Sequence, residues 1–467
     1  MTRSNSSSRF DRRSFLSYSA AAAGISVAKP FASLLAHPNH PRNGRGPSPD
    51  YGPLVEAIDE TTGLPLLLLP EDFKYLSFGW TRDPMSDGFL TPSAHDGMAA
   101  FPAGRGKVHL VRNHEVAEGP DAFGPATLAY DREAGGGTTT LEFDTNRGLV
   151  LSAWASISGT VRNCAGGATP WGSWLTCEET TLGPASNNDL TKNHGYIFEV
   201  PATGSTMIAG PDPQPFKAMG RFSHEALAID PATGWVYETE DAGSNSGFYR
   251  FRPTTPGVLE DGGVLEMLGI AGVDRADTRT NQTVGEWRDV KWHVIDTPDP
   301  AVPTGATSVF SQGRAKGAAV FGKLEGAWYG NGSIYFVASS GGDAGQGQIF
   351  EYNPSSHLLR LLFESPSADV LNAPDNLTVS PRGGLVLCED GDGTEYVHGL
   401  TTEGVIFRFI QNNVDLRTIP WNGFNQDYRS SEFAGACYSP DGKWLFVNIQ
   451  SPGITFAITG PWGSGGI

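Results

Sequence analysis

Short strand–turn–strand units recur along most of this chain, and they restrict the folds open to it. An apolar strand, a turn rich in proline, aspartate, asparagine or glycine, and an alternating strand follow one another in residues 228–241, 330–354, 376–391 and 437–453. Aspartate or asparagine before glycine accepts the positive φ that a tight hairpin requires. Helical patterns are weak, and the best short candidate is residues 93–100. Repeated hairpins predict an all-β protein, specifically a β-propeller, with a β-sandwich pair as the alternative.

Length and composition agree with this prediction. The chain has 467 residues with 59 glycines and 33 prolines, and only 18% of its residues are charged. These values are typical of an all-β protein with many tight turns. The length is unusual for one ordinary domain but normal for a closed repeat architecture. We expect a single propeller domain over residues 51–467, with six blades, inserted loops and short helices, although the spacing itself does not fix the blade count.

The first residues have the pattern of an export signal. Arg12 and Arg13 are followed by Phe15 and Leu16, and then by a weakly apolar run over residues 18–27. A run of this length is too short to span a membrane, which takes about 20 residues. The arginine pair predicts a twin-arginine signal over residues 1–36, which the twin-arginine translocation machinery would recognise during export of the folded protein. An ordinary secretory signal is the alternative. Residues 37–50 are expected to form a flexible linker, and the mature protein to be periplasmic or secreted.

The charge of the mature chain limits its partners. The whole sequence carries a net charge of −18, and residues 1–36 hold five basic residues and one acidic residue, so the remainder carries −22. Such a surface repels nucleic acid and anionic membranes, which we exclude as partners. It would also repel an anionic substrate unless bound cations reverse the local field. No second apolar run approaches membrane-spanning length.

Several familiar site types are missing. The four cysteines, Cys164, Cys177, Cys388 and Cys437, form no CxxC pair, which excludes a zinc ribbon and a dense disulfide framework. One or two disulfides remain possible in an oxidising compartment. The sequence has no G-x-S-x-G elbow and no H-E-x-x-H zinc helix. A serine hydrolase or a zinc protease is therefore not indicated.

One cysteine is followed directly by two carboxylates. Residues 175–179 read Leu-Thr-Cys-Glu-Glu, and alternation along a strand would place Cys177 and Glu179 on one side. A thiolate beside carboxylates favours a metal site. The alternative is a buried structural cysteine followed by two solvated glutamates, Glu178 and Glu179.

Further carboxylates stand at the ends of predicted strands. Glu225 precedes the apolar residues 226–229, and Lys323 and Glu325 are two residues apart and so share a strand face. The other candidates in such turns are Glu238, Glu240, Asp241, Asp375, Asn376, Glu389, Asp390 and Asp392. Oxygen-rich loops suit calcium, and one cysteine among them suggests an additional, softer or redox-active metal. Residues 389–392 lack the full calcium-loop pattern, and solvated strand-end acids are the alternative throughout.

Several short sequence motifs of this chain occur together in one known family. The chain resembles the PhoX-type alkaline phosphatases in its leader and, in family order, in residues 113–115 (NHE), 169–179 (TPWGSWLTCEE), 220–225 (GRFSHE), 324–328 (LEGAW), 374–376 (PDN) and 439–453 (SPDGKWLFVNIQSPG). The tryptophan-to-cysteine word is the most specific, and the last word is common to propellers. The resemblance implies a β-propeller whose site holds two ferric ions and calcium ions around a bridging oxygen.

The resemblance also implies roles for residues. Cys177 would be the iron-binding cysteine, Glu225 and Glu325 would belong to the iron site, and Asn163 would lie near the phosphate. The remaining metal positions would go to Glu178, Glu179, Asp241 and Asp375. One departure concerns Lys323, which stands where the family has an arginine that grips phosphate. Lysine keeps the charge but loses the bidentate fork that fits phosphate.

These observations predict a metal-dependent phosphomonoesterase. A metal cluster would activate an oxygen nucleophile, while Lys323 and Asn163 would stabilise charge on the phosphoryl group of a small ester. Cations would also overcome the repulsion between the acidic protein and its substrate. Two alternatives stay open. One is a calcium-dependent propeller lactonase or esterase, and the other is a non-catalytic periplasmic propeller that binds a protein partner.

Overall fold

The computed structural model describes residues 50–467 except 118, 120 and 203–212. The predicted leader and all but the last residue of the predicted linker lie outside these described residues. The described residues belong to one compact unit over residues 47–467. No helix among these described residues is both long enough and apolar enough to cross a membrane.

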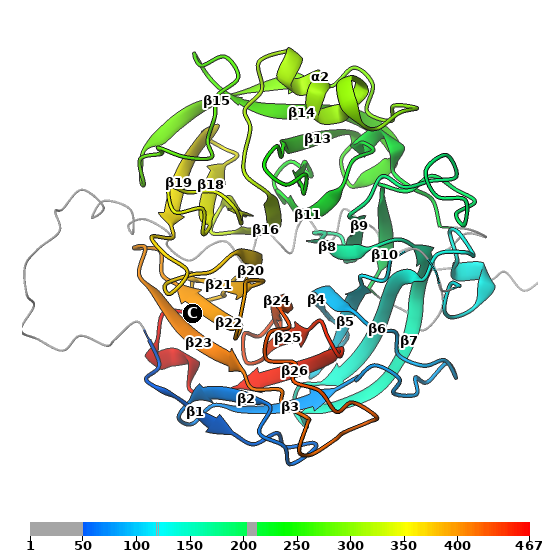
Figure 1. Cartoon of the computed structure of the whole chain (residues 1–467), viewed down its shortest axis with the longest axis vertical. Coiled ribbons are helices and arrows are strands. Elements are labelled where there is room, and N and C mark those ends of the chain that lie inside the picture. Colours follow the sequence, from blue (N-terminus) through cyan, green and yellow to red (C-terminus); the bar gives the residue numbers. More distant parts are fainter. Residues whose placement is uncertain (1–49, 118, 120, 203–212) are drawn as a thin grey trace, which may run out of the picture. The chain divides into compact units, whose positions relative to one another are not determined.

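Five sheets, of which the nine-stranded one forms two blades, follow one another around a common centre in the described part of this unit (Figure 1). The innermost strand of each blade contacts the innermost strand of the next blade, and the last contacts the first. In chain order these inner strands are β4 (His95–Pro102), β8 (Asn163–Ala168), β11 (His224–Ile229), β16 (Leu324–Gly330), β20 (Pro374–Val379) and β24 (Phe433–Tyr438). The fold is therefore a six-bladed β-propeller, which confirms the predicted fold class and excludes the two-sheet sandwich.

The blades are antiparallel and mostly four-stranded. Their outer strands are β5 (Lys107–His114), β6 (Gly136–Asp144) and β7 (Leu149–Thr160); β9 (Ser173–Glu178) and β10 (Ile197–Pro201); β12 (Val236–Glu240), β13 (Phe248–Thr255) and β14 (Val258–Ile270); β17 (Ser333–Ala338), β18 (Gln348–Asn353) and β19 (Leu358–Glu364); β21 (Leu385–Glu389), β22 (Tyr396–Leu400) and β23 (Ile406–Asn412); and β25 (Leu445–Ile449), β26 (Ile454–Thr459) and β3 (Lys74–Phe78). The four predicted hairpins correspond to pairs of consecutive strands in the last four blades.

Three further strands and one α-helix complete the unit. β15 (Trp287–Val294) pairs with both β14 and β19 and so links the third and fourth blades. β1 (Leu54–Ala57) and β2 (Leu67–Pro70) extend the fifth blade through β23. Among the described residues the only α-helix is α2 (Val309–Ala315), capped by the Ser308 side chain, which accepts from the Ser311 amide.

The ring closes by joining strands from both ends of the described chain. β3 pairs with β26, from Thr455 opposite Phe78 to Thr459 opposite Lys74, and so completes the sixth blade. Closure pairs an edge that would otherwise expose unpaired backbone groups. It also fixes the positions of all six inner strands relative to one another.

The inner strands approach each other so closely that they need small residues. A Cβ atom on Gly97 of β4 would lie 2.5 Å from the Ala165 Cα of β8, and one on Gly326 of β16 would lie 2.8 Å from the Asp375 carbonyl oxygen of β20. The prediction of a short helix over residues 93–100 was wrong, because most of these residues lie in strand β4. Its run of small residues reflects close strand packing and not helix propensity.

Candidate metal centre

Each inner strand begins with a β-bulge, and these bulges build the site. The pairing of every inner strand with the second strand of its blade shifts register near the start, after His95, Asn163, His224, Leu324, Pro374 and Ala434. A bulge re-aims one side chain out of the normal alternation. The residues that follow directly are Asp96, Cys164, Glu225, Glu325, Asp375 and Gly435. Five blades thus present a metal-ligand side chain at the same place.

The residue before the strand adopts a left-handed backbone in four of these blades. The φ angles of Ala94, Arg162, Lys323 and Ala373 are 50°, 51°, 43° and 45°. Such angles are uncommon for residues other than glycine and cluster at functional sites. Each of these residues stands two positions before the bulge side chain. The same local device therefore turns the chain into the centre in blade after blade.

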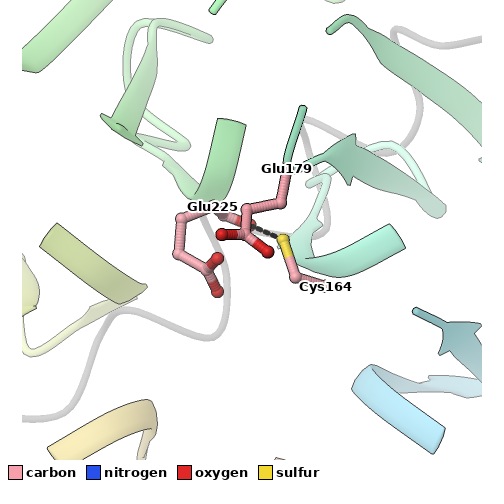
Figure 2. A group of neighbouring side chains, drawn as sticks. All are labelled: Cys164, Glu179 and Glu225. Carbon is pink, nitrogen blue, oxygen red and sulfur yellow. Dashed lines mark hydrogen bonds between the residues drawn. The ribbon is translucent and has the colours of Figure 1, made fainter. Parts of the chain in front are cut away.

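One group combines a thiol with two carboxylates. Ligand atoms of Cys164, Glu179 and Glu225 all lie within 4.8 Å of one another, and their side chains converge in Figure 2. The Cys164 thiol lies 3.3 Å from the backbone carbonyl oxygens of His224 and of Glu225, to which it can donate. Sulfur together with carboxylate oxygen is a donor set for a transition metal such as iron.

Two further groups contain only carboxylates. Glu225, Glu325 and Asp375 form one, and Asp96, Glu115 and Glu432 form the other. Glu225 belongs both to the group with Cys164 and to the group with Glu325 and Asp375, so these two groups are adjacent and share one ligand residue. Gln450 donates to Glu115 over 2.6 Å and so helps to fix that carboxylate. Groups of oxygen ligands suit hard cations such as calcium.

These carboxylates are too close and too buried to be charged together without cations. Burial, followed by the Glu325 and Asp375 charges, holds the pKa of Glu225 well above its ordinary value. Burial raises the pKa of Asp375 to about 7 and, with Asp241 and Glu115, that of Glu179 to about 9. Burial also raises the pKa of the Cys164 thiol. Cations bound here would remove this cost, because they stabilise the ionised ligands.

Two basic side chains lie beside the carboxylates. The Lys323 ammonium pairs with Glu325 and lies 4.0 Å from Asp241. Burial lowers the pKa of Lys323, but the Glu325, Asp375 and Asp241 carboxylates outweigh it and raise the pKa overall. The Arg162 guanidinium lies 4.0 Å from Glu179, and its side chain is 47% exposed. Both residues hold the left-handed position described above, in the second and fourth blades.

Some of the predicted site residues enter the three groups, and others lie one strand further from the centre. Glu179, Glu225, Glu325 and Asp375 enter the three groups, and Asp241 stays beside them through Lys323. Cys177 and Glu178 lie on β9, one strand out from the centre, and belong to none of the groups among the described residues. Other sequence candidates on second strands are Glu238 and Glu240 of β12 and Glu389 of β21, and these are equally absent from the groups.

Cys177 and Glu178 have structural surroundings. Cys177 is fully buried in an apolar cluster that includes Leu175 and Ile197. Glu178 is fully buried and accepts hydrogen bonds from the backbone amides of Val161, Gly195 and Tyr196, while one of its oxygens lies 2.6 Å from His194. The expected cysteine–carboxylate pair on one strand face is replaced by Cys164 of the inner strand with Glu179.

Asn163 is also held within the protein. Its side chain is fully buried, donates to the Thr176 hydroxyl over 2.9 Å and accepts from the Thr160 hydroxyl over 2.5 Å. Both ends of the amide are thus engaged within the protein. These bonds fix Asn163 at the start of β8, directly before Cys164.

Sequence reasoning missed Asp96, Cys164, Glu115, Glu432 and Arg162. Two of them were visible as words, since Glu115 ends the NHE word and Cys164 lies five residues before the TPWGSW word. The signal that could have found Asp96 is positional. A residue that starts a run of glycine and alanine at the head of an apolar strand marks an inner-strand bulge, as in Asp96-Gly97 and Cys164-Ala165.

Comparison with known proteins gives one family and a matching fold. A family model described as alkaline phosphatase PhoX matches residues 49–453. The structure of Pseudomonas fluorescens PhoX in complex with vanadate, a transition state analogue, is 18% identical, covers 90% of this chain and 99% of its own, and has a TM-score of 0.63. A Xanthomonas campestris gluconolactonase is 12% identical over 89% of this chain and 99% of its own, with a TM-score of 0.42. No curated protein sequence matches the chain.

Proposed function

This chain belongs to the PhoX alkaline phosphatase family, and from that premise we propose that it hydrolyses phosphomonoesters at alkaline pH with the help of bound metal cations. The observation that carries the proposal is the family match over residues 49–453, nearly the whole described unit. The convergence of carboxylates and one thiol at the bulges supports it, because an acidic site attracts a phosphate ester only when cations reverse its field.

Two kinds of cation fit the groups. The thiol group of Cys164, Glu179 and Glu225 would hold iron, and the carboxylate groups would hold calcium. This assignment follows the two ferric ions and the calcium ions that the family resemblance implies. Bound cations would supply Lewis-acid activation of the attacking oxygen and would neutralise charge on the phosphoryl group.

The basic residues would hold the phosphoryl group. Arg162 presents a half-exposed guanidinium, whose planar fork can meet two phosphoryl oxygens at once. Lys323 stays protonated at alkaline pH because neighbouring carboxylates raise its pKa, so it can contribute charge there. In this proposal Arg162 supplies the bidentate contact to the phosphoryl group that Lys323 cannot make. Arg162 does so from the equivalent position two blades away.

The Arg162→Lys variant should then raise KM for a phosphomonoester more than it lowers kcat.

Two cysteine variants test the metal assignment directly. Cys164→Ala should lose bound iron and phosphatase activity together, because its sulfur belongs to the thiol group. Cys177→Ala is the matched control, since that sulfur is also buried but belongs to none of the three groups. Iron is measured by elemental analysis of protein purified without chelator. Full iron content in Cys164→Ala would refute the assignment.

Substrate assays separate this function from the alternatives. The same preparation is offered a phosphomonoester, a lactone and a carboxylic ester, before and after treatment with a chelator. Phosphomonoester hydrolysis that stops on chelation is expected. Lactone or ester hydrolysis without phosphatase activity would favour a calcium-dependent hydrolase of another class, and no hydrolysis with no bound iron would favour a binding module.

The leader supports export of the folded protein by the twin-arginine route to the periplasm or beyond. Replacing Arg12 and Arg13 by lysine should keep the protein in the cytoplasm, whereas an ordinary secretory signal would tolerate the change. Cell fractionation of the two forms gives the answer.

A further inference from the structure

A cavity opens beside one of the carboxylate groups. It has a volume of about 300 Å³, and Glu325 and Asp375 form part of its wall. This is at the low end of ligand-binding cavities, which run from roughly 300 to 1,000 Å³. Under the proposed function the phosphoryl group sits against the carboxylate side, so the rest of the cavity must receive the alcohol of the ester.

The rest of the wall is polar, and most of it is uncharged. It contains the uncharged polar residues Ser339, Ser340, Gln346 and Asn372, and two charged side chains, Lys323 and Asp390. No aromatic side chain and no aliphatic side chain larger than Ala373 is among its described lining residues. A nucleobase or a phenyl ring would find nothing to stack on or to bury against there. Hydroxyl groups would find several partners, since serine, glutamine and asparagine side chains both donate and accept.

The loop that carries Gln346 is held firmly. Residues 339–347 connect β17 to β18, and a Cβ atom on Gly347 would lie 2.4 Å from Pro374, next to Asp375. The Asp343 amide donates to Glu364 over 3.0 Å, and the Gly347 amide donates to the Gly341 carbonyl over 2.9 Å. The half-buried Gln346 side chain makes no hydrogen bond within the described part of the chain. A rigid loop thus presents an amide with unused hydrogen-bonding capacity.

Charge restricts the alcohol further. Asp390 lies in the wall, and the Lys323 ammonium, which lies there too, is already paired with Glu325. A second anionic group on the alcohol would meet this carboxylate together with the acidic surface of the protein. Repulsive neighbours of this kind select against a ligand as effectively as contacts select for one.

From these features we infer that the cavity is a subsite for the leaving alcohol, and that it selects phosphomonoesters of small, uncharged, polyhydroxylated alcohols such as glycerol. Gln346 and Ser340 are its specificity-determining residues. The inference rests on the proposed phosphatase function and adds the class of substrate to it.

The experiment compares esters that differ only in the alcohol. Metal-containing protein is assayed with glycerol phosphate and with propyl phosphate, which has the same carbon chain without the hydroxyl groups. The wild type should show kcat/KM about fivefold to tenfold higher for glycerol phosphate, as expected for one or two neutral hydrogen bonds. Glycerol phosphate should also be preferred to 3-phosphoglycerate, which adds a carboxylate.

Variants connect the preference to the cavity. In Gln346→Leu and in Ser340→Ala the ratio of the two kcat/KM values should fall toward one. Gln426→Leu is the matched control, because Gln426 is an exposed glutamine outside the cavity, and it should keep the wild-type ratio. Circular dichroism and the melting temperature confirm that each variant is folded.

The outcomes distinguish the two claims. If the wild type hydrolyses both esters equally well, or if Gln346→Leu and Ser340→Ala both keep the preference, the subsite is refuted while the phosphatase function stands. Equal rates for glycerol phosphate and 3-phosphoglycerate would refute the selection by charge. If metal-containing protein hydrolyses none of these esters, the proposed function fails and the subsite fails with it.

Discussion

The two ends of the inner strands differ completely in chemistry. At the starting ends, bulges aim Glu225, Glu325 and Asp375 at one another. At the other ends of β8, β11 and β16, a cavity of about 210 Å³ is lined mostly by apolar side chains, including Ile229 and Trp328. The strands are the same, but alternation is broken at one end and kept at the other. The comparison shows that the bulges, more than the fold as a whole, make the site.

The largest expected effect comes from removing the shared ligand. Glu225→Gln should lower kcat/KM by at least about a hundredfold and reduce bound metal. Even mutation of a residue that only hydrogen-bonds to a metal ligand lowers metal affinity or activity by about 10- to 100-fold. Ile229→Val, on the same strand at the apolar end, should cost only about 0.5–1.5 kcal/mol of stability. Kinetics and elemental analysis check the first variant, and thermal unfolding checks the second. Equal effects on activity would break the comparison.

Metal removal should make the stability of the protein depend on pH, because the carboxylates at the starting ends of the inner strands then titrate. The pKa of Asp375 rises from 3.8 to about 7 in the fold, and that of Glu179 from 4.5 to about 9. Because the folded state holds these protons more tightly than the unfolded chain does, the stabilisation is complete below about pH 4 and is lost as the pH rises to about 9.

The melting temperature of chelator-treated protein should therefore fall between about pH 5 and pH 9. The loss should amount to several kcal/mol in all, since each pKa unit corresponds to about 1.4 kcal/mol. Calcium added at pH 9 should restore the melting temperature, because cations bind only the folded arrangement of carboxylates. A metal-free protein that is equally stable across this range would contradict the description of the site.

Filling a contact between inner strands should have an intermediate effect. A methyl group at Gly326 would press on the Asp375 carbonyl oxygen, so Gly326→Ala should cost about 1–3 kcal/mol and weaken calcium binding. Gly463→Ala is the control, since a Cβ atom there would meet nothing within 4 Å. Thermal unfolding with and without calcium compares the two. A calcium-independent loss in Gly326→Ala would show that the strand contact and the site are not coupled.

A charge at the far end should matter least. Lys443 lies in the turn between β24 and β25, and its 3.3 Å ion pair with Asp441 is largely exposed, with 69% and 43% of the two side chains accessible. Exposed pairs contribute roughly 0–1 kcal/mol. Lys443→Ala should therefore leave kcat/KM unchanged and shift stability only slightly. A clear loss of activity would mean that the far end contributes to the reaction after all.

The sequence predicted the fold well because its evidence was local. Turn chemistry such as Asp441-Gly442 specifies a hairpin without reference to the rest of the chain. Inner strand β4 was the exception, because its small residues are explained only by the strand in the next blade, where Gly97 meets Ala165. Contacts of that kind are invisible until the ring is closed.

The candidate site was predicted less completely, for a different reason. Alternation along a strand correctly pairs side chains only where the ladder is regular, and it therefore favoured Cys177 as the partner of Glu179. The bulge at the start of β8 breaks that rule and brings Cys164 to Glu179 from a neighbouring strand. Glu225 and Glu325 were found because each stands beside a recognisable apolar strand, whereas Asp96 was hidden in residues that resemble a helix.

The most direct test of this account is an anomalous scattering map at the iron absorption edge, from crystals of protein purified without chelator. The account predicts an iron peak in bonding contact with the Cys164 sulfur and flanked by Glu179 and Glu225. A map with no iron at Cys164, or with iron bound by Cys177 instead, would contradict it.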